Sequence, residues 1–103
     1  MNHLNVNSEC ESIAIQVNPI CLLWMVESAT TSQTFCLENS LTTRETFQNA
    51  LDTIQTSPSF TINDVEFELS LASVYEYKIN INDVLIVLDN EASRLFYRFW
   101  FFA

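Results

Sequence analysis

VEFELSLASVYEYKINI, residues 65–81, is the stretch of sequence that decides the fold. Its apolar residues fall on one parity and its charged and polar residues on the other, which is the period of a β-strand with one buried face. If the stretch folds back on itself, residues that share a face must lie opposite one another. A three-residue loop at residues 72–74 satisfies this condition and sets Leu71 opposite Tyr75. We predict this antiparallel hairpin, with one long bent strand as the alternative.

The sequence Ile-Asn-Asp-Val flanks the hairpin on both sides, at residues 62–65 and 81–84. Asn and Asp side chains bond to their own backbone and make turns without glycine. Each copy leads into an apolar run, so each is predicted to be a turn that begins a strand. The second run, VLIVL at residues 84–88, is apolar on both parities, which predicts a strand covered on both faces.

The C-terminal segment, residues 92–103, is the most aromatic part of the chain. Six aromatic residues from Phe96 to Phe102 favour a strand that pairs with residues 84–88. The alternative is a helix with one apolar face and with Arg94 and Arg98 on another. That apolar face would contain Ala92, Leu95, Phe96, Phe99 and Trp100. We predict the strand.

One amphipathic helix is predicted on the N-terminal side of the hairpin, from about Thr43 to Thr56. Apolar residues recur there at the spacing of one helical face. They are Phe47, Ala50, Leu51 and Ile54. Thr42 followed by Glu45 is a capping-box pattern that places the first turn near Thr43, and a Ser-Pro pair ends the helix.

The residues before this helix predict an antiparallel meander of strands. Ser12–Val17 alternates, residues 20–26 are apolar on both parities and would be covered on both faces, and residues 34–37 form a returning strand. Residues 1–10 are polar and are expected to be loose. The chain as a whole, residues 1–103, is predicted to be a small single α+β domain. Its antiparallel sheet would have five to six strands, with the helix packed on one face.

The composition is that of a folded and strongly acidic protein. The chain has 103 residues, of which 49% are hydrophobic, and thirteen Asp and Glu stand against four Lys and Arg. The formal net charge of −9 repels phosphate backbones and anionic membrane surfaces. We therefore expect no direct binding to nucleic acid or to membranes, and a basic protein as the partner.

Glycine is absent from the sequence, and His3 is the only histidine. Phosphate loops, dinucleotide fingerprints and the usual nucleophile elbow all need glycine. A histidine in a loose terminus cannot serve as the positioned base of a nucleophilic site. The sequence therefore predicts a protein that is not an enzyme and that uses no cofactor.

The three cysteines, Cys10, Cys21 and Cys36, lack CxxC spacing and histidine co-ligands, so no metal site is predicted. The longest apolar run, residues 20–26, is too short for a membrane span or a signal-peptide core. We expect a cytoplasmic protein with free thiols. Cys21 and Cys36 fall in predicted strands and are expected to be small core residues.

Seven of the thirteen acidic residues lie between Asp64 and Glu91. They are Asp64, Glu66, Glu68, Glu76, Asp83, Asp89 and Glu91. If they share one exposed sheet face and its turns, they present spaced negative charge that resembles a nucleic-acid backbone. In the predicted hairpin Glu68 would lie opposite Lys78 on this face. Such a surface would compete for the basic groove of a nucleic-acid-processing protein, such as a nuclease, a CRISPR effector or a toxin.

The sequence thus favours a small acidic inhibitor, with a phage anti-CRISPR or anti-defence protein as the preferred form, acting by charge mimicry. One alternative is an immunity protein that neutralises a nuclease toxin. Another is a non-enzymatic chaperone or adaptor that forms a homodimer through the aromatic C-terminus, with Tyr97, Phe99 and Trp100 as docking anchors. These are analogies of class, because no motif resembles a particular family.

Overall fold

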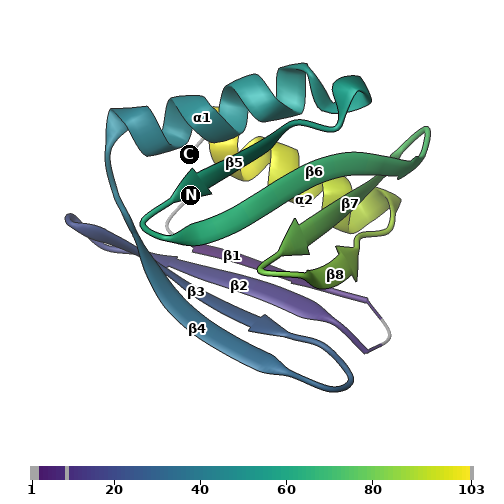
Figure 1. Ribbon diagram of the computed structural model, residues 1–103, viewed down its shortest axis with the longest axis horizontal. Helices are drawn as coiled ribbons and strands as arrows, with labels where there is room; N and C mark the ends of the chain where they lie inside the picture. The colour runs from purple at the N-terminus through teal and green to yellow at the C-terminus, as the bar shows by residue number, and fades with distance from the viewer. Residues whose placement is uncertain (1–2, 9, 103) are drawn as a thin grey trace.

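Two antiparallel sheets and two α-helices enclose one aromatic core in the computed structural model, which describes residues 3–8 and 10–102 (Figure 1). The first sheet has the strand order β1 (His3–Asn7), β2 (Ser12–Val17), β3 (Cys21–Glu27) and β4 (Ser32–Glu38). The second sheet has the order β5 (Ser59–Ile62), β6 (Val65–Ser73), β7 (Glu76–Ile81) and β8 (Val84–Val87). The α+β class is confirmed, but the prediction of one sheet of five to six strands with one helix is wrong.

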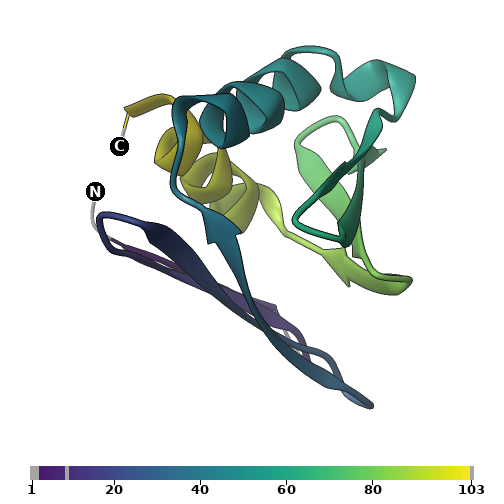
Figure 2. The ribbon, with the colours of Figure 1, turned by 60° about the vertical axis from the view of Figure 1, so that its left-hand side comes forward.

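The helices connect and close the two sheets. α1 (Leu41–Asp52) and the short 3₁₀-helix η1 (Ile54–Thr56) join β4 to β5, and α2 (Asn90–Phe102) follows β8. Figures 1 and 2 show the first sheet along one side of the molecule, with the second sheet and both helices on the other. Among the described residues, no strand of one sheet pairs with a strand of the other.

The first sheet is the predicted meander with one additional strand. β1 lies in the segment that was expected to be loose, so that expectation is wrong for residues 3–7. Leu4 and Val6 alternate with asparagines and are buried, and β1 packs against α2. Pairing with β2 along all five residues and burial of these two side chains hold this edge strand. Residues 1, 2 and 9 of the segment lie outside the described residues.

Both apolar runs that were expected to be covered on two faces have only one buried face. In β3 the side chains of Leu23 and Met25 point to the outer face and are half-buried. In β8 Ile86 is buried, whereas Leu85 is 46% exposed. Neighbouring strands shield these outward residues partly, and no further layer of described residues covers them. In this protein, an apolar run on both parities therefore did not mean that the strand is covered on both faces.

α1 confirms the predicted helix but starts and ends earlier. The N-cap is Ser40, not Thr42, and its side-chain oxygen accepts a hydrogen bond from the backbone N–H of Thr43 at 3.2 Å. α1 ends at Asp52, and the following turn tightens into η1. The predicted inward residues, Phe47, Ala50, Leu51 and Ile54, are all buried.

β6 and β7 form the predicted hairpin, and the alternative of one bent strand is wrong. The loop differs, because Ser73 pairs with Glu76 across a two-residue turn, and Leu71 pairs with Tyr77 instead of Tyr75. A two-residue turn alone would set opposite parities against each other. The register shift between Leu71 and Ser73 is a bulge of one residue, Ala72, which restores matching faces.

The two Ile-Asn-Asp-Val segments are tight hairpin turns, as predicted. Asn63 and Asp64 have φ of 49° and 66°, and Asn82 and Asp83 have φ of 48° and 68°. Two successive residues with positive φ make a type I′ turn, and Asn and Asp tolerate this region better than other residues except glycine. The turns thus replace Asn-Gly in a chain without glycine.

α2 occupies the segment that was predicted to be a strand, so the helical alternative is the right one. Oδ1 of Asp89 accepts a hydrogen bond from the backbone N–H of Ala92 at 2.8 Å and starts the helix. Ala92, Phe96, Phe99 and Trp100 are buried along one face. Burial of this whole face against α1, β1 and β7 outweighs the preference of isolated aromatic residues for strands.

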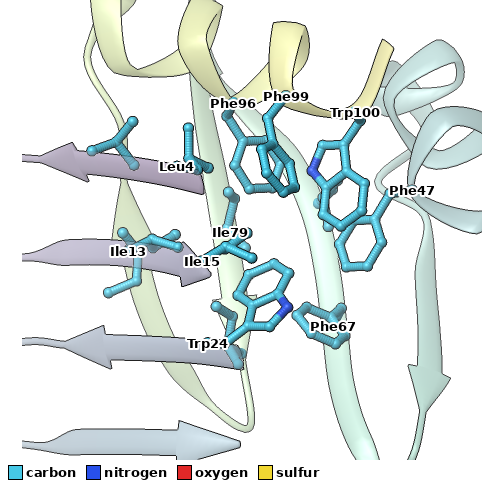
Figure 3. Packing of buried hydrophobic residues seen from close by; sticks show 14 of the residues in the cluster. Leu4, Ile13, Ile15, Trp24, Phe47, Phe67, Ile79, Phe96, Phe99 and Trp100 are labelled. Carbon is cyan, nitrogen blue, oxygen red and sulfur yellow. The ribbon is translucent and has the colours of Figure 1, made fainter. Parts of the chain in front are cut away.

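The core is centred on Trp24, which β3 directs between the two sheets (Figure 3). Its ring lies 5.3 Å from Phe67 of β6 and 5.6 Å from Phe47 of α1. Phe47 in turn stacks on Trp100 of α2, with ring centroids 4.0 Å apart and planes 3° from parallel. One aromatic cluster therefore joins elements from both sheets and both helices.

Candidate functional site

The seven predicted acidic residues do not share one face. Four lie at the turn end of the second sheet, on β6 and in the two Asn-Asp turns: Asp64, Glu66, Glu68 and Asp83. The other three lie near the beginning of β7 and of α2: Glu76, Asp89 and Glu91. The surface formed by the first group is the stronger candidate, because the carboxylates of Glu66 and Glu68 have no hydrogen-bond partner among the described residues, whereas those of Glu76 and Asp89 have one.

Glu66, Glu68 and Asp83 line a shallow surface cavity of about 400 Å³ on the outer face of the second sheet. We call this cavity the acidic groove; its walls are Ser59, Phe60, Thr61, Glu66, Phe67, Glu68, Asn80 and Asp83. The hollow has a simple origin. β5 places the short side chains of Thr61 and Ser59 opposite the two glutamates.

The register of the hairpin keeps positive charge out of the acidic groove. Glu68 lies opposite Asn80, and Lys78 lies one pair further along, opposite Ser70. The expected pairing of Glu68 with Lys78 is therefore wrong, because the turn lies at Val74 and Tyr75 and not at residues 72–74, and together with the bulge at Ala72 this moves the register by two residues. No lysine or arginine is found among the described residues that line the groove.

The end of the groove is held in place by hydrogen bonds that start in the two turns. The backbone N–H of Glu66 donates to Oδ1 of Asn82 at 2.9 Å, and the N–H of Asn82 donates to the carbonyl of Glu66 at 2.9 Å. Nδ2 of Asn82 also donates to Oε1 of Gln33 in the first sheet at 3.2 Å. The backbone N–H of Glu38 donates to Oδ1 of Asn63 at 2.9 Å. β4 thus fixes both turns, and with them the backbone that carries Glu66 and Asp83.

The second group of acids has structural partners within the protein. Glu76 accepts a hydrogen bond from the Ser73 hydroxyl at 2.9 Å, and Asp89 caps α2. Glu91 lies in the first turn of α2, where a negative charge is favoured by the helix dipole. These roles within the protein explain the acidic residues at the three positions, so no partner protein is needed to explain them.

Of the predicted docking anchors, Phe99 and Trp100 are buried in the core and Tyr97 is half-buried. Phe99 and Trp100 can touch a partner only if the core opens. Tyr97 stacks on Phe101, with ring centroids 4.4 Å apart, and lies at the surface beside Tyr77. Burial raises the pKa of the Tyr77 hydroxyl, and the neighbouring Tyr97 raises it further.

A second surface cavity, of about 240 Å³, lies between α2 and the tip of the β6–β7 hairpin. We call it the tyrosine groove; it is lined by Val74, Tyr75, Tyr77, Asn90, Ser93, Arg94 and Tyr97. The sequence pointed only to Tyr97. Asn90, Ser93 and Arg94 were missed because the tail was expected to be a strand, and a strand would not bring these three residues onto one surface.

The three cysteines are free thiols, but the prediction that Cys21 and Cys36 are core residues is wrong. Cys10 and Cys36 are exposed, and Cys21 is half-buried. β3 and β4 place Cys21 and Cys36 as diagonal neighbours on the outer face of the first sheet. A hydrogen bond with Cys36 is the main cause that raises the pKa of the Cys21 thiol, and burial adds to it, while Asn18 acts in the opposite direction.

We expect a thiol reagent at pH 8 to label Cys36 and Cys10 before Cys21. Labelling requires the thiolate, and a raised pKa lowers the thiolate fraction at a given pH. The lag of Cys21 should shrink as the pH is raised, and Cys36→Ala should shorten it at pH 8, whereas Cys10→Ala should not. Mass spectrometry of the modified peptides over time measures each site. Labelling of Cys21 first would contradict this reading of the pair.

The remaining sequence expectations concern histidine, metals and membranes. His3 lies exposed in β1. In the described part of the chain, no three His, Cys, Asp or Glu side chains gather in a way that could hold a metal ion. No helix among residues 3–8 and 10–102 has the length and apolar character needed to cross a membrane.

Fold and site together define a small α+β domain of two four-stranded antiparallel sheets that carries an anionic groove. Comparison with protein-family models, with curated proteins and with solved structures finds no match for this chain.

Proposed function

We propose that this protein is a small acidic inhibitor that uses the acidic groove to occupy a basic surface of a nucleic-acid-processing protein. The observation that carries the proposal is the composition of the groove. Three carboxylates, from Glu66, Glu68 and Asp83, line one hollow that contains no basic side chain among the described residues. The proposed action of the protein is binding alone, without a reaction or a cofactor.

The geometry of the groove suits the recognition of a row of positive charges. Glu66 and Glu68 point to the same side of one strand, so their Cα atoms are about 7 Å apart. Both are exposed and flanked by short polar side chains, so a long Lys or Arg side chain can reach either carboxylate. The net charge of −9 adds a long-range field that speeds association with a basic partner.

The preferred form of this proposal is a phage anti-CRISPR or anti-defence protein that mimics the charge of nucleic acid. An immunity protein that neutralises a basic nuclease toxin would use the same surface in the same way. Both forms would act in the cytoplasm, a compartment that suits three free thiols. The alternative of an adaptor that dimerises through the aromatic C-terminus has less support, since Phe99 and Trp100 face the core.

Capture of the partner from the native host, followed by a salt titration of the complex, tests this proposal. We expect a basic nuclease, CRISPR effector or toxin that dissociates as salt rises from about 0.1 to 0.5 M, because exposed ion pairs are screened at these concentrations. Added DNA or RNA should compete with the inhibitor for the partner. A partner without a basic surface, or a complex that 0.5 M salt leaves intact, would contradict the proposal.

A further inference from the structure

The tyrosine groove differs from the rest of the surface in both charge and polarity. Val74 and Tyr75 at the hairpin tip are 76% and 69% exposed, although both are large and apolar. Arg94 is the only charged residue that lines the groove among the described residues. A basic and aromatic hollow is unexpected on a protein with a formal net charge of −9. Tyr and Arg are also the residues most enriched in binding hot spots.

The walls of the groove are fixed before anything binds. The backbone N–H of Tyr77 donates to Oγ of Ser93 at 2.9 Å, and that hydroxyl donates to the carbonyl of Leu88 at 3.1 Å. This bridge ties β7 to the first turn of α2. Stacking on Phe101 holds the ring of Tyr97. A partner would therefore meet a surface that is already in place at Tyr77, Ser93 and Tyr97. The exposed hairpin tip at Val74 and Tyr75 forms the other wall of the groove.

We propose that the tyrosine groove binds an extended peptide segment of a partner protein in which a proline lies next to an acidic residue. Tyrosine rings in a groove present flat apolar surfaces against which proline rings pack, as in the recognition of polyproline II segments. Arg94 supplies a fork of N–H donors for the carboxylate. A volume of about 240 Å³ accommodates a short segment and not a folded element.

This site is independent of the acidic groove. The tip of the β6–β7 hairpin lies at one end of β6, and Glu66 lies near the other. The eight positions from Glu66 to Val74 correspond to about 26 Å of extended strand. The two surfaces also select opposite charges, so the failure of one proposal leaves the other standing.

The test uses three defined peptides and the intact protein. The probe is acetyl-Glu-Pro-Pro-amide, and its matched controls are acetyl-Lys-Pro-Pro-amide and acetyl-Glu-Ala-Ala-amide. Binding is followed by changes in the NMR signals of Tyr75, Tyr77, Arg94 and Tyr97. We expect the Glu-Pro-Pro probe to bind about threefold more tightly than the Lys-Pro-Pro control, because an exposed ion pair contributes that much. It should also bind more tightly than the Glu-Ala-Ala control, because alanine has no ring to pack on the tyrosines. Equal binding of the Glu-Ala-Ala peptide would overturn the proline part of the proposal. The net charge of the protein would favour the lysine peptide, so a preference for the acidic one has to come from the groove.

Two variants locate the preference. Arg94→Gln should abolish the discrimination between the Glu and Lys peptides, whereas Arg98→Gln should leave it unchanged. Arg98 is an exposed arginine one helical turn further along that does not line the groove. Equal or tighter binding of the lysine peptide, signal changes outside the groove only, or discrimination that survives Arg94→Gln would each overturn the proposal.

Discussion

Replacing Trp24 with alanine is expected to lower the free energy of unfolding by about 3–5 kcal/mol, which is the range for removal of a buried aromatic side chain. Trp24 is fully buried, and the rings around it come from β4, α1, β6 and α2. The cavity left behind would be bordered by both sheets and both helices, so no single element can move to fill it. Because a domain of this size is stable by about 5–15 kcal/mol in total, the variant should lose a large fraction of its stability.

Urea unfolding followed by circular dichroism measures this loss, and Met25→Ala is the matched control. Met25 is the next residue on the same strand, but its side chain lies half-buried on the outer face. Its removal should cost less than about 1 kcal/mol, because little enclosed volume is created. If the two variants lost similar amounts of unfolding free energy, Trp24 would not be the side chain that packs the two sheets together.

Trp24→Phe keeps the test informative if the alanine variant does not fold. The indole nitrogen of Trp24 has no hydrogen-bond partner among the described residues and points toward the ring of Phe67 in Figure 3. A buried N–H without a partner costs about 1–3 kcal/mol, and phenylalanine removes that cost while it keeps most of the packing. We therefore expect Trp24→Phe to lose less than about 2 kcal/mol.

The strands and turns of the second sheet could be read from the sequence because their signals are local. Alternation in VEFELSLASVYEYKINI specified which residues of β6 and β7 face the core. The Asn-Asp pairs specified the two turns, since few residue types accept positive φ. The exact register could not be read, because it depends on a bulge at Ala72 that leaves the parity pattern of the hairpin almost unchanged.

The division into two sheets and the helical tail could not be predicted, because both are decided by distant contacts. The face of α2 that carries Phe96 and Trp100 is helical in period, but its residues individually prefer strands. The helical arrangement is favoured by burial of this face against α1, β1 and β7, including the contacts of Trp100 with Phe47 and Trp24. The same limit applies to the candidate site. The acids were predicted as one surface, and their separation into two groups follows from where β7 and α2 begin.

Removing the three charges of the acidic groove should weaken binding to the captured partner about 10- to 100-fold. The variant is Glu66→Gln, Glu68→Gln and Asp83→Asn. Each exposed carboxylate that meets a basic side chain contributes about 0.5–1 kcal/mol, and three such contacts together give this factor. The fold should be unaffected, because both glutamates are exposed and asparagine tolerates the positive φ of position 83. Glu76 is left unchanged because it bonds to Ser73.

The matched control removes three exposed charges elsewhere: Glu27→Gln on β3, and Glu45→Gln and Asp52→Asn on α1. Both variants have the same net charge, so they lose the same long-range attraction. Binding to a lysine decapeptide, which responds mainly to net charge, should fall equally in the two. Binding to the captured partner, measured by competition at 0.15 M salt, should fall much further in the groove variant. Equal affinities of the two variants for that partner would refute recognition by the groove and leave only non-specific attraction between opposite charges.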